Sequence, residues 1–216
     1  MTPDPSPVQQ RRLEEKEARR EQILDAAEQA LSKKGFDGVV LADVAAASRL
    51  SRGLLYTYFA DKVDLFHAVA VRASTELHRR FREAAEGTEP GMSKVHAIGQ
   101  SYVRFASERP ILFEALARSE ASEVDLDEHS PNALMALERS QRVLGVVTAA
   151  IEAGMEDGSI RTDLGDARET ALVLWGVTHG MIQVTAHKDP ILGHYGTTPG
   201  AVHDHGFSLI DRALRP

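Results

Sequence analysis

Apolar side chains recur at the spacing of an α-helix along most of this chain, and that periodicity limits the fold more than any other feature. The clearest example is the apolar face of residues 11–34, which consists of Ile23, Leu24, Ala26, Ala27, Ala30 and Leu31. No segment alternates apolar and polar residues for long enough to indicate a half-buried strand. We therefore expect an all-α protein.

The same periodicity predicts a series of helices after residue 60. Asp61 is expected to cap the first of them, with the Asp64 carboxylate reaching back to the amide of the cap residue. The expected ranges are 61–82, 93–107, 111–118, 131–156, 166–187 and 199–214. Residues 1–7 contain three prolines and should form a flexible tail, and the acidic residues 120–128 should form a solvated loop.

Three helices are predicted before residue 60. Gly35 stands where glycine often ends a helix, and a second apolar-periodic segment, residues 41–48, follows it. A turn at residues 49–50 then leads to Ser51, which should cap a third helix that runs through residue 59. This order indicates a helix-turn-helix with supporting helices on either side.

The third helix is expected to have one buried and one exposed face. Leu55 and Phe59 are four residues apart, so they point to the same side and must pack on the first two helices. The opposite face carries hydrogen-bond donors, two rings and a glycine, and it suits a DNA major groove about 12 Å wide. Lys62 would place a cation beside a backbone phosphate. The predicted DNA-binding residues are Arg49, Ser51, Arg52, Gly53, Leu54, Tyr56, Thr57, Tyr58 and Lys62.

The string ILDAAEQALSKKGFDGVVLADVAAASRLSRGLLYTYFADKVDLF, residues 23–66, resembles the tetracycline-repressor (TetR) family of transcriptional regulators. The resemblance implies a homodimeric repressor that binds double-stranded operator DNA and is released by a small-molecule effector. It also implies that the third helix reads bases, while Tyr56, Tyr58 and Lys62 mainly hold phosphates. The later strings EDGSIRTDLG and LWGVTHG are similar to the family's dimerising helices.

Three positions depart from the family pattern. Val40 and its neighbours stand where Ser or Thr usually caps the second helix, so a cap contribution of about 1 kcal/mol is missing. Arg49 occupies a turn that commonly contains glycine, where a positive φ would cost strain. Tyr58 replaces a frequent histidine, but a phenol can still donate a hydrogen bond to a phosphate.

The helical C-terminal part is expected to sense the effector and to dimerise. Helix 166–187 is apolar around much of its circumference, and Gly176 and Gly180 permit close approach of another helix. We therefore predict that this helix and helix 199–214 form a subunit interface. The alternative is that they pack only within one chain. His179 interrupts the apolar pattern with a group that titrates near neutral pH. The candidate ligand contacts, each of which has ordinary core packing as its alternative, are Tyr102, Phe105, Phe113, Leu116, Met135, Leu144, Trp175, His179 and Met181.

Composition bounds the remaining possibilities. The chain has no cysteine and a net charge of −7, yet residues 1–62 balance ten basic against ten acidic side chains, so the N-terminal part is the relatively basic one. No secretory leader or membrane span is expected, which predicts a cytoplasmic protein. Four histidines gather near the C-terminus, but their spacing matches no standard metal site. They are His187, His194, His203 and His205.

The predicted organisation is a flexible tail (1–18), a helix-turn-helix domain (19–64) and a helical ligand-sensing and dimerisation domain (65–216). No nucleophile elbow, phosphate loop or inward-facing Glu-x-x-His pair is present, so we expect no enzyme, no cofactor and no metal. The alternative function is a helical enzyme or scaffold protein that has lost DNA binding.

Overall fold

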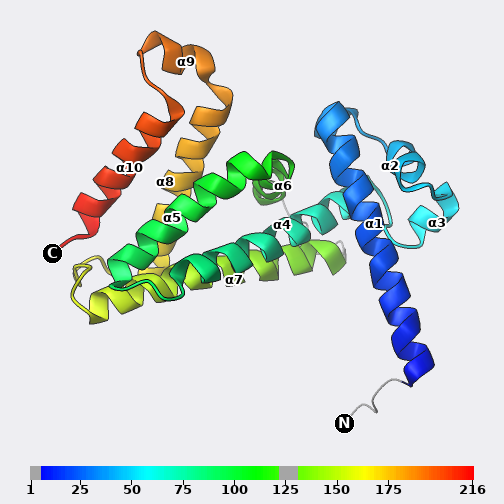
Figure 1. Cartoon of the computed structure of the whole chain (residues 1–216), viewed down its shortest axis with the longest axis horizontal. Coiled ribbons are helices and arrows are strands. Elements are labelled where there is room, and N and C mark those ends of the chain that lie inside the picture. The colour runs from blue at the N-terminus through cyan, green and yellow to red at the C-terminus, as the bar shows by residue number, and fades with distance from the viewer. Residues whose placement is uncertain (1–5, 122–130) are drawn as a thin grey trace. The chain divides into compact units, whose positions relative to one another are not determined.

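The computed structural model describes residues 6–121 and 131–216, and within these ranges it contains helices and no strands. The expected all-α fold is therefore confirmed. Of the expected acidic loop, the first two residues belong to a helix, and residues 122–128 lie outside the described ranges. The helices, shown in Figure 1, are α1 (Pro7–Gly38), α2 (Leu41–Ser48), α3 (Arg52–Tyr56), α4 (Lys62–Ala85), α5 (Gly91–Glu108), α6 (Pro110–Ala121), α7 (Pro131–Glu156), α8 (Ala167–His187), α9 (Asp189–His194) and α10 (Pro199–Leu214).

The chain divides into two compact units. The first consists of Met1–Arg72 and Glu114–Ala136, and the second of Ala73–Phe113 and Leu137–Pro216. This division differs from the predicted boundary after residue 64, because α4, α6 and α7 each contribute residues to both units. No helix in the described ranges is both long and apolar enough to cross a membrane.

α1 begins at Pro7, four residues before the helix expected over residues 11–34, and it includes residues 7–18 of the expected tail. The Ser6 hydroxyl accepts a hydrogen bond from the Gln9 amide at 3.4 Å, and the Gln9 side chain accepts one from the Ser6 amide at 2.8 Å. This reciprocal cap satisfies two amide donors at the helix start, and Pro7 occupies the first helical position, where no amide donor is needed. Residues 7–10 were missed because this part of the helix buries no side chain, so the sequence shows no apolar periodicity there.

The first unit is built around α1. Its residues Ile23, Leu24 and Ala27 are fully buried, and α2 packs against it. The chain leaves the helical conformation at Gly35, whose φ of +68° and ψ of 171° lie in a region that glycine adopts readily because it has no Cβ. The short segment that follows returns to α2, so the helix-turn-helix is held on one side of α1.

The start of α4 is capped as expected in one respect and differently in another. The Asp61 carboxylate accepts a hydrogen bond from the Asp64 amide at 2.8 Å. The Asp64 carboxylate accepts from the Ala60 amide at 3.0 Å, one residue before the predicted partner, and also from the Asn132 side chain at 2.7 Å. Each oxygen of the Asp64 carboxylate thus has a donor, which accounts for a buried acidic side chain.

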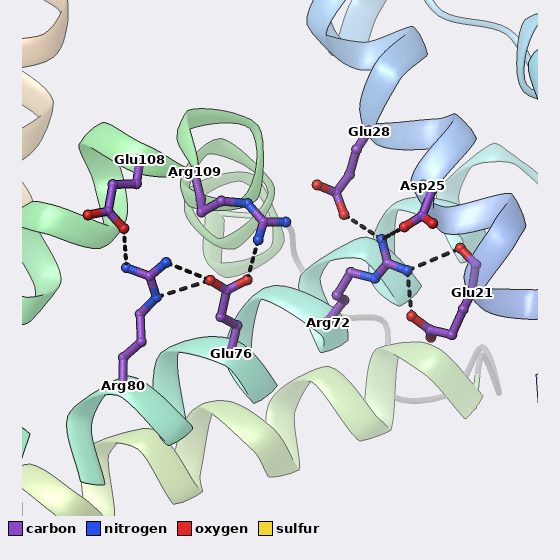
Figure 2. A network of polar contacts seen from close by, with 8 residues as sticks. All are labelled: Glu21, Asp25, Glu28, Arg72, Glu76, Arg80, Glu108 and Arg109. Carbon is purple, nitrogen blue, oxygen red and sulfur yellow. Dashed lines mark hydrogen bonds and ion pairs between the residues drawn. The ribbon is translucent and has the colours of Figure 1, made fainter. Parts of the chain in front are cut away.

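In the first unit, Arg72 of α4 forms ion pairs with three carboxylates of α1 (Figure 2). Its guanidinium lies 2.7 Å from Asp25 and 2.6 Å from Glu28, and it also pairs with the side chain of Glu21. The three acids are spaced four and three residues apart, so they share one face of α1. This face of α1 is therefore fixed to α4 by charge.

In the second unit, α4 carries another charged network, also drawn in Figure 2. Glu76 pairs with Arg80 at 2.8 Å and with Arg109 at 2.7 Å, and Arg80 pairs with Glu108 at 2.6 Å. Glu108 and Arg109 lie at the junction of α5 and α6. The network therefore holds α4 beside this junction.

The rest of the second unit packs around α5, α8 and α10, which contact one another pairwise. The short helix α9 was not predicted, because six residues are too few to show a helical period. The C-terminal histidines lie at helix ends or within α10, and the His203 ring contacts the Thr185 hydroxyl at 2.9 Å. No group of three metal-binding side chains occurs in the described ranges.

Candidate nucleic-acid interface and effector site

The turn between α2 and α3 is tightly defined. Arg49 adopts the left-handed conformation, with φ 57° and ψ 36°, as the sequence suggested for a position where glycine is common. The Leu50 amide then donates to the Ala45 carbonyl at 2.9 Å and closes the end of α2. A left-handed arginine costs about 1–2 kcal/mol, so the surrounding structure must hold the turn.

The buried face of α3 is the one predicted. Leu55 and Phe59 are both fully buried, and the Arg20 guanidinium of α1 lies 5.6 Å from the centre of the Phe59 ring. Ser51 caps α3 by accepting a hydrogen bond from the Leu54 amide at 3.2 Å. The helix ends at Tyr56, three residues earlier than expected, because the amides of Tyr58 and Phe59 both bond to the Leu55 carbonyl in a closing turn.

The opposite face of α3 is open. Arg52 and Gly53 are exposed, and Leu54 and Tyr56 are 40% and 55% exposed. A side chain placed at Gly53 would meet no atom within 4 Å, so the backbone there can be approached closely. Most of the predicted DNA-binding set therefore forms one accessible surface. Its exposed members are Arg49, Ser51, Arg52, Gly53, Leu54, Tyr56 and Thr57, and Tyr58 and Lys62 are half-buried.

Lys62 has contacts that sequence reasoning missed. Its ammonium donates to the Asp37 carbonyl at 3.3 Å and lies 5.3 Å from the centre of the Phe66 ring. Asp37 lies in the turn after Gly35, 25 residues before Lys62 in the sequence. An ammonium has three donors, so two remain for a phosphate while the third holds this turn.

The second unit contains a small apolar cavity of about 40 Å³. Its walls come mainly from α5, α8 and α10, and none of its lining residues is an acid, a lysine or an arginine. Tyr102 and Trp175 belong to the predicted ligand set. The lining residues are Phe81, Met92, Val95, His96, Ile98, Gly99, Tyr102, Val147, Leu174, Trp175, Thr178, Phe207 and Ile210.

A cluster of rings adjoins this cavity around His179. The His179 ring stacks on Phe113 with a centroid separation of 5.0 Å and lies 5.2 Å from the Trp175 ring. The Tyr102 hydroxyl is 2.8 Å from His179 Nδ1. Burial lowers the pKa of His179, so the imidazole is neutral at neutral pH. Four of the predicted ligand contacts are thus brought together.

The other predicted ligand contacts lie elsewhere. Leu116 and Met135 belong to the first unit, and Met135 is 39% exposed. Phe105 is fully buried beneath the Arg80 guanidinium, and Leu144 does not line the cavity.

Met181 also lies away from the cavity lining. Its sulfur packs so closely on Gly206 that an added Cβ there would lie only 2.0 Å from it. Five lining residues of α5 were not predicted, and three of them, Val95, Ile98 and Gly99, lie seven, four and three residues before Tyr102, on the same side of the helix. This helical spacing could have identified them, but it is the same for residues of the core and for residues that line a cavity.

An exposed apolar face runs along α8. Val173, Val177 and Val184 are 63%, 44% and 44% exposed. Gly176 and Gly180 lie beside them, and a Cβ at either would meet no atom within 4 Å. In α10, Leu209 is 50% exposed.

Comparisons with known proteins agree with this geometry. Residues 23–69 match the family model described as bacterial regulatory proteins, tetR family, and residues 95–205 match the tetracyclin repressor-like C-terminal domain. The chain is 33% identical over 84 residues to the HTH-type transcriptional repressor BepR of Brucella suis, a match that covers 39% of each protein. It is 33% identical over 115 residues to the repressor KstR of Mycobacterium tuberculosis, covering 50% of this chain and 52% of KstR. The chain thus spans about half or less of the length of these relatives.

Solved structures share the fold over nearly the whole chain. A protein of unknown function from Rhodococcus sp. RHA1 superposes with a TM-score of 0.75 at 23% identity, covering 92% of this chain and 96% of that one. FadR from Bacillus subtilis, solved in complex with stearoyl-CoA, gives a TM-score of 0.71 at 15% identity, covering 91% and 100%. Because the C-terminal family model alone matches more than half of the residues, this chain belongs to the tetR family of bacterial transcriptional regulators.

Proposed function

We propose that this regulator is a homodimeric repressor that binds operator DNA through α3 and is released by a small apolar molecule bound in its second unit. The observation that carries the DNA-binding part is the division of α3 into two faces. Leu55 is fully buried while Arg52 and Tyr56 are open to solvent, so the helix is anchored with its polar face presented. A major groove admits such a helix.

Arg52 is the residue that we assign to base reading. It lies in the first turn of α3 and is exposed, and its guanidinium makes no hydrogen bond or ion pair with any described residue. A guanidinium in this position can bond to O6 and N7 of one guanine, a contact that contributes about 1–3 kcal/mol of discrimination. Tyr56, Tyr58 and Lys62 are assigned to backbone phosphates, which position the protein without reading sequence.

Dimerisation is supported by the exposed apolar face of α8 and by Leu209 of α10. A soluble monomer rarely exposes a contiguous apolar face, and the glycines at 176 and 180 leave room for a second helix. A two-fold dimer would present two copies of α3 to adjacent half-sites about one helical turn of DNA apart.

Effector binding is supported by the cavity beside Tyr102 and His179. A volume of about 40 Å³ holds little more than water, so any organic molecule must displace side chains. The ligand would therefore favour a different packing of α5, α8 and α10, and it lowers operator affinity only if that packing binds DNA less well. The walls contain no acid, lysine or arginine, which favours a neutral apolar ligand body. The FadR relative, solved with stearoyl-CoA, supports ligand sensing in this fold.

The proposal is tested by selecting a duplex from a random-sequence library with the wild-type protein and measuring its affinity beside that of a scrambled duplex. We expect the wild type to prefer the selected duplex and Arg52→Ala to lose most of that preference. Arg104→Ala is the matched control, because Arg104 is an exposed arginine of the second unit. A wild type that selects no sequence, or an Arg52→Ala variant with unchanged preference, would contradict the assignment.

A further inference from the structure

The first turns of α1 form a helix whose side chains are exposed among the residues that the structure describes. Residues 7–19, here called the N-terminal extension, are all exposed, including Val8 at 63% and Leu13 at 57%. The extension lies before residue 23, where the family match begins. Its helix is supported locally, by the cap at Ser6 and by a side-chain hydrogen bond of 2.9 Å from Gln10 to Glu14. Core packing therefore does not explain its composition.

Three cations of the extension lie in one stripe. Arg12, Lys16 and Arg19 are spaced four and three residues apart, which places them within about 60° of one another around the helix. None of the three pairs with a carboxylate of the described residues, and Arg19 bonds only to the neutral Gln22 side chain at 3.3 Å. Arg11, outside the stripe, is in contrast paired with Glu15 at 3.0 Å. The stripe is therefore an uncompensated positive surface.

Two neighbouring contacts show which way the stripe faces. Gln22 and Arg20 flank its direction, at about 80° on either side of the Arg12 position. The Gln22 amide donates to the Ser48 carbonyl at the end of α2 at 3.1 Å, and the Arg20 guanidinium lies over the Phe59 ring just after α3. The stripe therefore points to the side of α1 that carries the helix-turn-helix, and the extension continues past α2 and α3 (Figure 1).

A surface cleft of about 620 Å³ joins the extension to the end of α3. Of the stripe, Lys16 alone lines this cleft, together with Thr57 and Tyr58, which follow α3 and belong to the predicted DNA-binding set. Arg20 adds a second cation to the lining, which also contains the acids Glu14, Glu17 and Asp64. The acidic residues of α1 that bind Arg72 lie on the opposite face of the helix (Figure 2). The positive face of α1 is thus the one that continues the candidate DNA interface.

We propose that Arg12, Lys16 and Arg19 form a second DNA-binding surface, which contacts backbone phosphates beside the base pairs reached by α3. The inference rests on the proposed operator binding and extends it beyond the helix-turn-helix. The stripe rises about 10 Å along α1, which matches about three base pairs of duplex. Cations that neutralise phosphates release counterions, so they add affinity and salt dependence for every sequence alike.

The test replaces the three cations together by glutamine, as Arg12→Gln/Lys16→Gln/Arg19→Gln, because glutamine keeps a high helix propensity. Affinities are measured for the duplex selected by the wild type and for a scrambled duplex, over a series of salt concentrations. We expect at least a tenfold loss for both duplexes at low salt. The slope of log affinity against log salt should become shallower by about 0.9 for each phosphate that the variant no longer neutralises in each subunit. The ratio of the two affinities should stay unchanged.

The matched control removes the same charge from the second unit, as Arg79→Gln/Arg82→Gln/Arg142→Gln. These arginines are 58%, 61% and 53% exposed, and each pairs with a glutamate four residues away. The control should keep wild-type affinity and slope. A stripe variant that matches this control would overturn the inference.

A shorter duplex separates the stripe from the surface of α3. When the selected duplex is trimmed to the base pairs that α3 requires, the stripe variant and the wild type should bind alike, because the flanking phosphates are gone. If the stripe variant instead lost sequence preference, the stripe would read bases, and the inference would be wrong. If the wild type selects no duplex, the proposed function fails as well. If the wild type selects a duplex but the stripe variant binds it with wild-type affinity and salt dependence, the inference is overturned and the proposed function stands.

Discussion

Tyr102 and His179 share a hydrogen bond of 2.8 Å between the phenol oxygen and Nδ1, and it joins α5 to α8 beside the apolar cavity. The Gln183 amide nitrogen lies 3.3 Å from Nε2 of the same ring and donates to it. The neutral imidazole therefore carries its proton on Nδ1 and donates it to Tyr102. Both ring nitrogens are satisfied, which allows a histidine to lie among the rings of Phe113 and Trp175.

This environment predicts a pH-dependent stability. Burial lowers the pKa of His179 below its ordinary value of about 6.5, so the unfolded chain binds more protons as the pH falls through that value. The free energy of unfolding should decrease from about pH 7 downward, until the folded imidazole also becomes protonated. His179→Gln should reduce this loss. Urea unfolding of both proteins between about pH 5 and 8 measures the difference.

Two other histidines contribute equally to the pH dependence of stability in the wild type and in His179→Gln. Burial also lowers the pKa values of His78 and His203, so each contributes the same sign of pH dependence to wild type and variant. The difference between the two proteins therefore isolates His179. Parallel pH profiles would contradict the prediction.

The start of α2 predicts a stabilising substitution. Val40 has the extended conformation of a cap residue, with φ −125° and ψ 156°, but its side chain makes no cap bond. The Asp43 carboxylate already accepts from the Val40 amide at 3.1 Å, so half of a reciprocal cap is present. Val40→Ser should complete it and raise the free energy of unfolding by about 1 kcal/mol. Val40→Ala should give no gain, and equal stabilities of the two variants would show that the hydroxyl forms no bond.

Much of the helix-turn-helix could be predicted because its signals are local. The spacing of Leu55 and Phe59, the glycine at position 35 and the cap at Ser51 each depend on neighbours within one or two turns. The structure confirms the burial, the positive φ and the cap bond. The strained Arg49 was also visible, since a turn that usually contains glycine imposes its backbone conformation on any residue.

The features that could not be predicted depend on contacts between residues that are distant in sequence. The Lys62 contact with the Asp37 carbonyl and the ring cluster around His179 require knowledge of which helices pack together. An apolar period marks Phe105 and Tyr102 alike, although Phe105 is core and Tyr102 borders the cavity. The first four residues of α1, 7–10, were missed because capping, without burial, defines that start.

The Arg72 cluster predicts a stability effect in the first unit. Arg72→Met leaves the carboxylates of Glu21, Asp25 and Glu28 without their shared cation, and these like charges then repel one another (Figure 2). We expect a loss on the order of 2 kcal/mol, less than for a fully buried pair because the side chains of Glu21 and Asp25 are 49% and 66% exposed. Denaturant unfolding at neutral pH measures the loss.

Lowering the pH should reduce the difference in the free energy of unfolding between Arg72→Met and the wild type, because protonated carboxyl groups no longer repel one another. The matched control is Arg79→Met, which removes an exposed ion pair with Glu83 and should cost less than about 0.5 kcal/mol. If both variants lost the same stability, the three-acid cluster would have no special role.

The exposed face of α8 predicts that Gly180→Leu disrupts dimerisation and DNA binding together. Within one chain a Cβ at Gly180 meets no atom within 4 Å, so the variant should fold, but leucine would hold a second helix away from the apolar line beside Val177 and Val184. A monomer engages one half-site, so affinity should fall by about a hundredfold or more. Gly145→Leu on α7 is the control, since Gly145 is also exposed and unobstructed. Sedimentation and DNA binding of both variants check the prediction, and a monomeric wild type at micromolar concentration would refute it.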